Sequence, residues 1–174
     1  MRLATPKQGC VLRPWAPGDK ASLVANANNH RVWRNLADVF PHPYTDADAD
    51  QWFRIANSPG RSIHFAIEVD GAAVGSISAR AGEGIFARTA HFGYWLGEPL
   101  WGRGIMTAAG RAMLDHLKQD ARFARLEAPV FEWNPSSMRV LEKLGFERVA
   151  VLRRSVTKDG QLIDSVLYSH LIKP

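Results

Sequence analysis

The 174-residue chain has a single cysteine, Cys10, and no apolar run long enough for a membrane helix. One thiol cannot form an intramolecular disulfide, which is typical of proteins in a reducing compartment. A membrane helix needs roughly 20 apolar residues, and the segment from Met1 to Pro6 lacks the apolar core of a signal peptide. We therefore expect a cytoplasmic protein without membrane contact, and an ordinary thiol at Cys10 in a flexible N-terminal segment.

The sequence also lacks the clustered basic residues that nucleic-acid binding requires. Its formal net charge is +5, but the lysines and arginines are scattered, and Arg153-Arg154 is the one tight pair. Nucleic-acid-binding domains place Lys and Arg on one face, with interleaved aromatic residues for single strands. We expect no nucleic-acid partner. The positive charge belongs either to an ordinary soluble surface or to a surface that attracts a smaller anion, such as a cofactor that carries phosphates.

No repeat, low-complexity segment or long linker interrupts the chain, so we expect one domain over residues 1–174. The alternating stretches 62–69 and 73–79 flank Asp70-Gly71, which is a strong hairpin signal. Further strands are expected at 11–15, 91–98, 125–133, 146–156 and 161–172, and helices at 17–29, 31–37, 45–57, 102–119 and 135–144. This pattern predicts an α/β (α+β) fold: a mixed, mostly antiparallel sheet of about seven strands with about four flanking helices.

The most informative segment is a glycine turn between a strand and a helix. The strand 91–98 leads into Gly102-Arg103-Gly104, where an amphipathic helix begins. The first N–H groups of a helix have no carbonyl partner within it, and their positive end can bind phosphate. A Rossmann turn would need a third glycine, and a nucleotide-binding P-loop would need Gly-Lys-Ser/Thr. Both are absent, which leaves an anion site of another kind or a plain helix entry.

A second segment begins at Asn134-Pro135, which is a good helix N-cap followed by a good first residue. Capping is therefore the simplest role for Asn134. Ser137 shares a face of the expected helix with Leu141 and Leu144. Its hydroxyl is either bonded to a preceding carbonyl in the core or presented to a cleft.

Together these two segments resemble the acetyl-CoA-binding core of the GNAT N-acetyltransferase superfamily. The resemblance rests on residues 93–107 (GYWLGEPLWGRGIMT) and 134–146 (NPSSMRVLEKLGF). The stretches 12–15 and 40–45 are similar to the subgroup of ribosomal-protein N-terminal (alanine/serine) acetyltransferases and their relatives. The resemblance implies a GNAT-like domain with splayed central strands and an activity that transfers an acetyl group to a primary amine.

The resemblance also implies which residues bind acetyl-CoA. The pantetheine arm is expected to pair with the backbone from Leu96 and Gly97 to Glu98, and Asn134 is expected to contact the arm near its thioester. The diphosphate is expected on the backbone of the helix start, at Trp101, Gly102, Arg103, Gly104, Ile105, Met106 and Thr107. Backbone can approach a phosphate closely in a turn that has few bulky side chains.

Two departures from the superfamily pattern affect these expectations. Trp101 stands where the phosphate loop usually begins with Gln or Arg, and Met106 where it usually ends in Gly or Ala; backbone amides do not depend on either side chain. Leu141 occupies the position at which many members carry a tyrosine as general acid. In the ribosomal-protein subgroup a serine one turn earlier is the proposed acid, and Ser137 matches it. The subgroup's proposed base, a glutamate acting through water, matches Glu98; an exposed charge near a helix start is the alternative.

The acceptor remains open at the level of sequence. We expect a protein or peptide N-terminal α-amine, with a small amine such as a polyamine, aminoglycoside or amino acid as the alternative, and a non-catalytic acyl-CoA-binding module as the competing class. The acceptor is expected between the early helices and the last strands, near His42, Tyr44 and the hairpin 155–164. His91 is a second candidate base. We expect no metal, since Asp46 and Asp48 are charges at a helix start, and members of the superfamily commonly form homodimers.

Overall fold

The computed structural model describes residues 1–172, so the last two positions of the expected domain 1–174 lie outside the described residues. Its strands are β1 (Leu3–Ala4), β2 (Cys10–Arg13), β3 (Ile63–Val69), β4 (Ala72–Ala81), β5 (Thr89–Leu96), β6 (Arg125–Phe131), β7 (Glu147–Lys158) and β8 (Gln161–Leu171). Its α-helices are α1 (Lys20–Ala27), α2 (His30–Trp33), α3 (Asp46–Ala56), α4 (Ile105–Lys118) and α5 (Pro135–Lys143). Short 3₁₀ turns cover Pro17–Asp19, Gly84–Phe86 and Glu98–Leu100.

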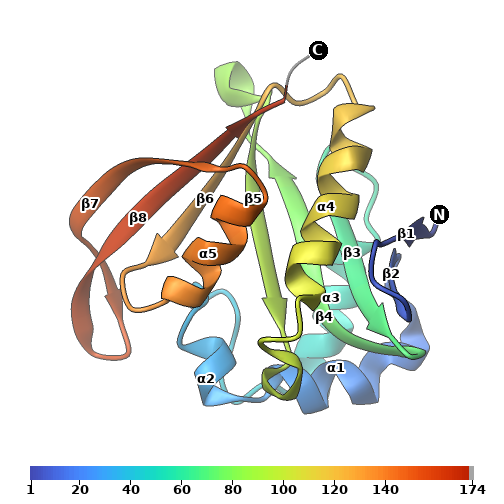
Figure 1. Cartoon of the computed structure of the whole chain (residues 1–174). Helices are drawn as coiled ribbons and strands as arrows, with labels where there is room; N and C mark the ends of the chain where they lie inside the picture. Colours follow the sequence, from blue (N-terminus) through green and yellow to red (C-terminus); the bar gives the residue numbers. More distant parts are fainter. Residues whose placement is uncertain (173–174) are drawn as a thin grey trace.

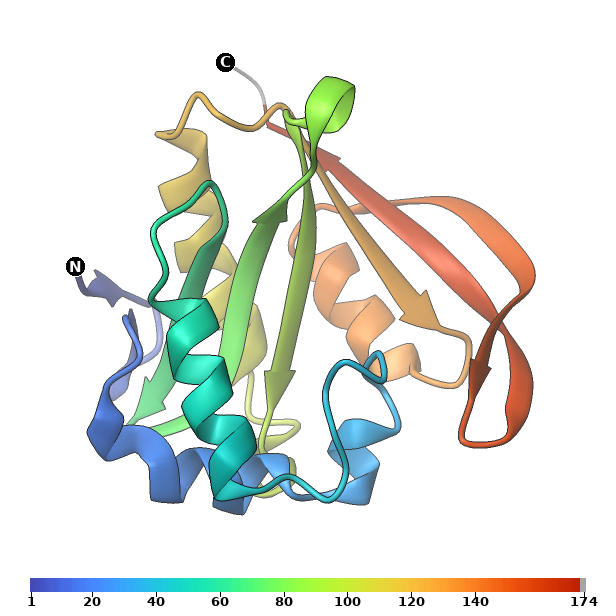
Figure 2. The ribbon, with the colours of Figure 1, turned by 180° about the vertical axis from the view of Figure 1, so that it is seen from behind.

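The strands form one eight-stranded sheet in the order β1-β2-β3-β4-β5-β6-β8-β7. All neighbours are antiparallel except β5 and β6, which are parallel. Helices α4 and α5 cover one face of the sheet, and α1, α2 and α3 lie on the other (Figures 1 and 2). This confirms the expected mixed, mostly antiparallel α/β fold; the eighth strand is the two-residue β1, which is too short for its pattern to show.

Strands β5 and β6 pair only at their beginnings. The paired residues run from Thr89 to His91 on β5 and from Arg125 to Glu127 on β6. Beyond them the two strands diverge, and α5 lies in front of the space between them (Figure 1). Pro129 lies on β6 past this point, and its neighbour is β8. Of the edge, bulge and splayed positions that a strand proline allows, the structure selects the splayed one.

Local sequence chemistry explains the helices that frame the site. Thr45 caps α3 in a capping box with Asp48, whose carboxylate accepts from the Thr45 backbone N–H at 2.8 Å. The apolar side of α4 is buried against the sheet, as its spacing predicted, and comprises Ile105, Ala109, Ala112, Met113 and Leu117. Helix α2 starts one residue before the expected 31–37, where Asn29 caps it by accepting from the N–H groups of Arg31 and Val32, and it ends early, at Trp33.

Two apolar clusters hold the layers together. The larger one joins the sheet to α4 and α5 and includes Phe92, Met113 and Leu141. The smaller one joins the sheet to α1 and α3 and is built around Trp15 and Tyr44. Cys10 belongs to the larger cluster and is 2% exposed, so the expectation of a flexible segment there was wrong: β2 pairs with β3 and carries this side chain into the core. Among residues 1–172, no helix has the length and apolarity to span a membrane.

Candidate active site

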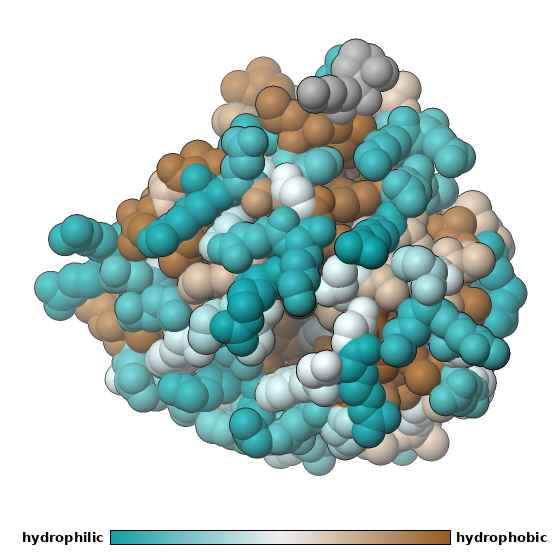
Figure 3. Space-filling view, viewed as in Figure 1, coloured by the Kyte–Doolittle hydropathy of each residue, from teal (hydrophilic) through white to brown (hydrophobic). Residues whose placement is uncertain are grey.

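The chain enters α4 through two left-handed glycines. Gly102 has φ +74° and Gly104, the N-cap of α4, has φ +73°. This backbone region costs residues with a Cβ roughly 1–2 kcal/mol, which is why glycine occupies both positions. No atom lies within 4 Å of where a Cβ would stand at either glycine, so the turn leaves open space in front of the helix. Figure 3 shows this face as largely hydrophilic, with a hollow near its centre.

The start of α4 presents a run of unsatisfied donors. The Trp101 N–H donates to the Glu98 carbonyl at 3.1 Å, and the next backbone bond of the helix runs from Ala108 to Gly104 at 3.1 Å. Between them, the N–H groups of residues 102–107 find no acceptor outside the helix within the described chain. Free N–H groups at the positive end of a helix are the arrangement at which proteins commonly bind anions. Of the seven residues from Trp101 to Thr107, six thus present free N–H groups at the start of α4. The seventh, Trp101, has its N–H bonded to Glu98.

The edge of β5 that faces the gap offers further backbone groups. The Gly97 N–H donates to Val74 on the β4 side at 2.8 Å. Because successive residues of a strand point their backbone groups to opposite edges, Leu96 and Tyr94 present theirs to the gap. The Leu96 carbonyl there accepts from Trp101 Nε1 at 2.7 Å. The Leu96 N–H and the backbone of Tyr94 are thus available to a ligand.

Gly97 has a different role from its neighbour. Its N–H is bonded to Val74, and its carbonyl accepts from the Leu100 N–H at 3.0 Å. A Cβ on Gly97 would overlap the side-chain amide of Asn26 on α1. Gly97 therefore allows α1 to pack closely against the end of β5.

Ser137 meets Tyr94 across the gap, and Asn134 caps the helix that carries Ser137. Asn134 Oδ1 caps α5 by accepting from the Ser137 N–H at 3.2 Å. The Ser137 Oγ lies 2.8 Å from the Tyr94 hydroxyl, which also lies 3.2 Å from the Ser137 carbonyl oxygen. Burial raises the pKa of Tyr94 to about 12, so both hydroxyls are protonated at neutral pH. Nothing in the sequence around Tyr94 indicates this role, because an aromatic residue in a strand is typical of the core.

Glu98 lies at the other side of the gap and is held by the N-terminal end of α2. One carboxylate oxygen accepts from Asn29 Nδ2 at 2.8 Å, and the other is bonded to Arg31 Nη1. The side chain of Glu98 is 27% exposed. The guanidinium of Arg31 also lies 5.8 Å from the Trp101 ring. Glu98 is thus a fixed, partly exposed carboxylate beside the glycine turn, and the N-terminal end of α2 supplies the residues that fix it.

Helix α2 also contacts the opposite side of the gap. Arg34, just after α2, stacks on the Trp133 ring at 4.1 Å, next to Asn134. Arg31 and Arg34 thus tie one short helix both to the end of β5 and to the end of β6. Neither contact follows from sequence spacing, because the partners are separated by at least 67 residues.

A cavity of about 710 Å³ lies on the face of the sheet that carries α1 to α3. Its lining includes Tyr44 from the expected acceptor region, and Tyr94 where the strands diverge. His42 and the hairpin 155–164 are not part of this lining. The hairpin instead docks on the segment after α2, through Lys158 and Asp38 at 2.5 Å. The expected position of the acceptor between helices and last strands therefore differs from the cavity, which lies between α3 and β3 to β5.

Comparison with known proteins now identifies the family. A sequence profile of the acetyltransferase (GNAT) domain matches residues 10–147. The chain belongs to the GNAT acetyltransferase family. The matched range contains the glycine turn, Ser137 and Gly145, so the resemblance drawn from residues 93–107 and 134–146 is confirmed.

Several GNAT proteins are similar to this chain. "Probable N-acetyltransferase YjcK" of Bacillus subtilis is 41% identical over 73 residues, which is 42% of this chain and 40% of that protein. The ribosomal-protein-serine acetyltransferase of Escherichia coli is 31% identical over 85 residues, 49% of this chain and 48% of that protein. The chain thus spans about half the length of these curated relatives. The structure of Mycobacterium smegmatis RimJ in complex with CoA-disulfide is 28% identical, covers 98% of this chain and 86% of RimJ, and has a TM-score of 0.83.

Proposed function

We propose that this protein transfers the acetyl group of acetyl-CoA to a primary amine, most favourably the N-terminal α-amine of a protein or peptide. The observation that carries the proposal is the joint placement of the free N–H groups 102–107 and the Ser137–Tyr94 hydroxyl pair at one gap in the sheet. The RimJ structure holds a CoA derivative, and the E. coli relative is named for a ribosomal-protein serine. Both support the proposed cofactor and acceptor class.

Backbone groups would hold the cofactor. The donors at the start of α4 fit a diphosphate, since each charge there gains about 0.3–1 kcal/mol and several donors act together. The backbone of Tyr94 fits the amides of a pantetheine arm as an added strand would. Asn134 would contact the arm near its thioester, although its Oδ1 already caps α5. Acetyl-CoA supplies an acetyl thioester that an amine can attack directly.

Three tasks then fall to residues of this chain. Glu98 would accept the amine proton through a water, and its bonds to Asn29 and Arg31 would fix the orientation of its carboxylate. The Leu96 N–H would donate to the oxygen on which charge develops. Ser137 would donate its proton to the leaving sulfur, with the Tyr94 hydroxyl as its hydrogen-bond partner at 2.8 Å.

The acceptor preference follows from the free energy of deprotonation. An α-amine has a reference pKa near 8 and a lysine amine near 10.4, so removing the lysine proton at pH 7 costs about 3 kcal/mol more. A carboxylate that acts through water offers little to offset this difference. An α-amine is therefore the better substrate for this site. A small-molecule amine is the second candidate, favoured by the cavity of about 710 Å³, which is in the range of small-ligand sites.

The proposal is tested with the full chain, acetyl-CoA and a panel of amines. The panel contains peptides with free Ser or Ala N-termini, the same peptides blocked at the N-terminus with one internal lysine, and a polyamine. Thiol release and the peptide mass report transfer. We expect free N-termini to be acetylated far faster than blocked peptides. Ser137→Ala should lower kcat by about 10²-fold or more, whereas Ser136→Ala, an exposed neighbour on α5, should not.

The outcomes separate the candidate functions. Acetylation of the polyamine alone would move the acceptor to small molecules. A melting temperature raised by CoA without transfer to any amine would indicate a binding module. Absence of both effects would refute the proposal.

A further inference from the structure

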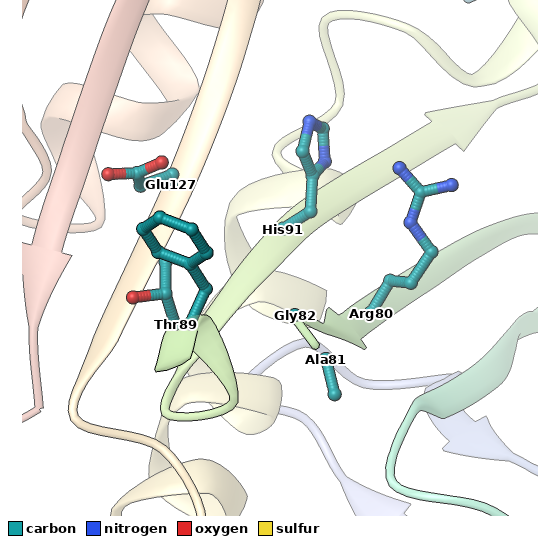
Figure 4. A pocket seen from close by; sticks show the side chains of 7 residues that line it. Arg80, Ala81, Gly82, Thr89, His91 and Glu127 are labelled. Carbon is teal, nitrogen blue, oxygen red and sulfur yellow. The ribbon is translucent and has the colours of Figure 1, made fainter. Parts of the chain in front are cut away.

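The cavity beside α3 ends in an arginine without an anionic partner. Arg80 lies on β4 opposite His91 of β5, and both line the cavity. Figure 4 shows the two side chains projecting to the same side from neighbouring strands. Among residues 1–172, no carboxylate lies within ion-pair distance of Arg80. Arg80 therefore places an uncompensated positive charge at one end of the cavity.

The imidazoles around Arg80 do not compensate this charge. Desolvation and the Arg80 charge lower the pKa of His64, and the same two causes lower that of His91. Both rings are therefore neutral at pH 7 and can serve as hydrogen-bond donors. His64 lines the cavity, and its Nδ1 is buried without a hydrogen-bond partner among the described residues. The Ser78 hydroxyl stands in the same row, opposite His64 in the strand register.

The nearby carboxylates are already engaged elsewhere. Glu127, across β5 from Arg80, pairs with Arg125 at 2.8 Å. Asp48, on the far wall of the cavity, accepts from the Thr45 hydroxyl at 2.6 Å and from the Thr45 N–H at 2.8 Å. Two arginines line the cavity without a carboxylate partner among residues 1–172: Arg80, and Arg61, which donates to the Ala87 carbonyl at 3.0 Å. With several neutral donors beside Arg80, this end of the cavity fits an anionic group on the ligand.

Strand geometry sets the distance between this end of the cavity and the proposed transfer point. Three residues separate His91 from Tyr94, or roughly 10 Å along β5. An extended peptide advances about 3.3–3.6 Å per residue. The Tyr94 hydroxyl points to the α5 face of the sheet, but the Tyr94 residue also lines the cavity where the strands diverge. A peptide in the cavity whose amine reaches the gap at Tyr94 would thus bring the side chain of its second or third residue to Arg80.

We propose that the acceptor carries a carboxylate two to three residues' length from its amine, and that Arg80 binds this carboxylate in the cavity beside α3. The inference rests on the proposed function and deepens it, because it assigns acceptor selection to a residue outside the cofactor turn. The carboxylate is either an acidic side chain near a protein N-terminus or the C-terminal group of a short free peptide.

The first arm of the test compares two peptides that differ in one group. They share a Ser N-terminus and carry Glu or Gln at the third position. We expect kcat/KM to be about tenfold higher for the Glu peptide, and this ratio to fall to about one to two in Arg80→Gln. Arg111→Gln removes the same charge from an exposed position on α4 and should keep the ratio. Raising the salt concentration should lower the ratio in the unaltered protein, since screening weakens exposed charges.

The second arm uses a free tripeptide and its C-terminal amide. Preference for the tripeptide acid, lost in Arg80→Gln, would assign the carboxylate to a small acceptor; preference for the Glu peptide assigns it to a protein N-terminus. Equal kcat/KM values for the Glu and Gln peptides, and also for the tripeptide acid and its amide, would overturn the inference. The acetyltransferase proposal would remain intact. Failure to acetylate any peptide would instead count against the proposed function itself.

Discussion

Removing the Tyr94 hydroxyl should slow the reaction through Ser137. In Tyr94→Phe the Ser137 Oγ loses its partner at 2.8 Å, and the Ser137 carbonyl loses a contact at 3.2 Å. A typical hydrogen bond contributes about 0.5–1.5 kcal/mol. Loss of one or two such bonds predicts a free energy of unfolding that is lower by about 1–2 kcal/mol. If the same bond orients the Ser137 proton toward the sulfur, kcat should fall by about five- to thirtyfold, at 1.36 kcal/mol for each factor of ten.

The assay is a double-mutant cycle on kcat, with saturating acetyl-CoA and a peptide that has a free N-terminus. Single Tyr94→Phe and Ser137→Ala proteins are compared with the double variant. Because Tyr94 is assigned to act through Ser137, the double variant should be no slower than Ser137→Ala alone. Tyr168→Phe is the matched control: the Tyr168 hydroxyl donates to Glu142 of the same helix at 3.0 Å and takes no part in the proposed site.

Three results would refute this reasoning. Fully additive losses in the double variant would show that Tyr94 acts independently of Ser137. An equal loss of kcat in Tyr168→Phe would show that any weakened anchoring of α5 is sufficient. A lower stability without a change in kcat would reduce Tyr94 to a structural role.

Three further predictions concern stability. Gly97→Ala should lower the free energy of unfolding by about 1–3 kcal/mol, because its Cβ would overlap Asn26; urea unfolding should show almost no change for Gly60→Ala, whose Cβ meets nothing within 4 Å. The pKa of Tyr94 rises from 10 to about 12 on folding. The neutral hydroxyl therefore adds about 3 kcal/mol at most to the free energy of unfolding; this contribution is complete below pH 10 and lost by pH 12. Tyr94→Phe should show a smaller decline over that range, and an identical decline would contradict the assignment. Burial, then the Arg80 charge, lowers the pKa of His64 on folding, so stability should fall as pH drops below roughly 6.5; His64→Gln should reduce that fall in thermal unfolding measured from pH 7 to 5.

Local patterns predicted most elements of the fold, because their signals lie within a few residues. Asp70-Gly71 marked the hairpin of β3 and β4, and the spacing of apolar residues located the buried side of α4. Such patterns are weakest for short elements. The two-residue β1 was not predicted, and α2 was expected to be longer than it is. Cys10 was misplaced for a related reason: a four-residue strand gains its burial from β3, more than 50 residues away.

Some features of the candidate site are likewise local in the sequence, and others depend on tertiary packing. The sequence by itself determined the glycine turn before α4, since left-handed glycines and a helix start are local properties of residues 102–107. It also placed Asn134 and Ser137 at the start of α5. Only the tertiary structure decided that Tyr94 bonds Ser137, that Arg31 holds Glu98, and that Arg80 has no carboxylate partner among residues 1–172. Each of these depends on which strands pair and where they part, and that is set by the packing of the whole sheet.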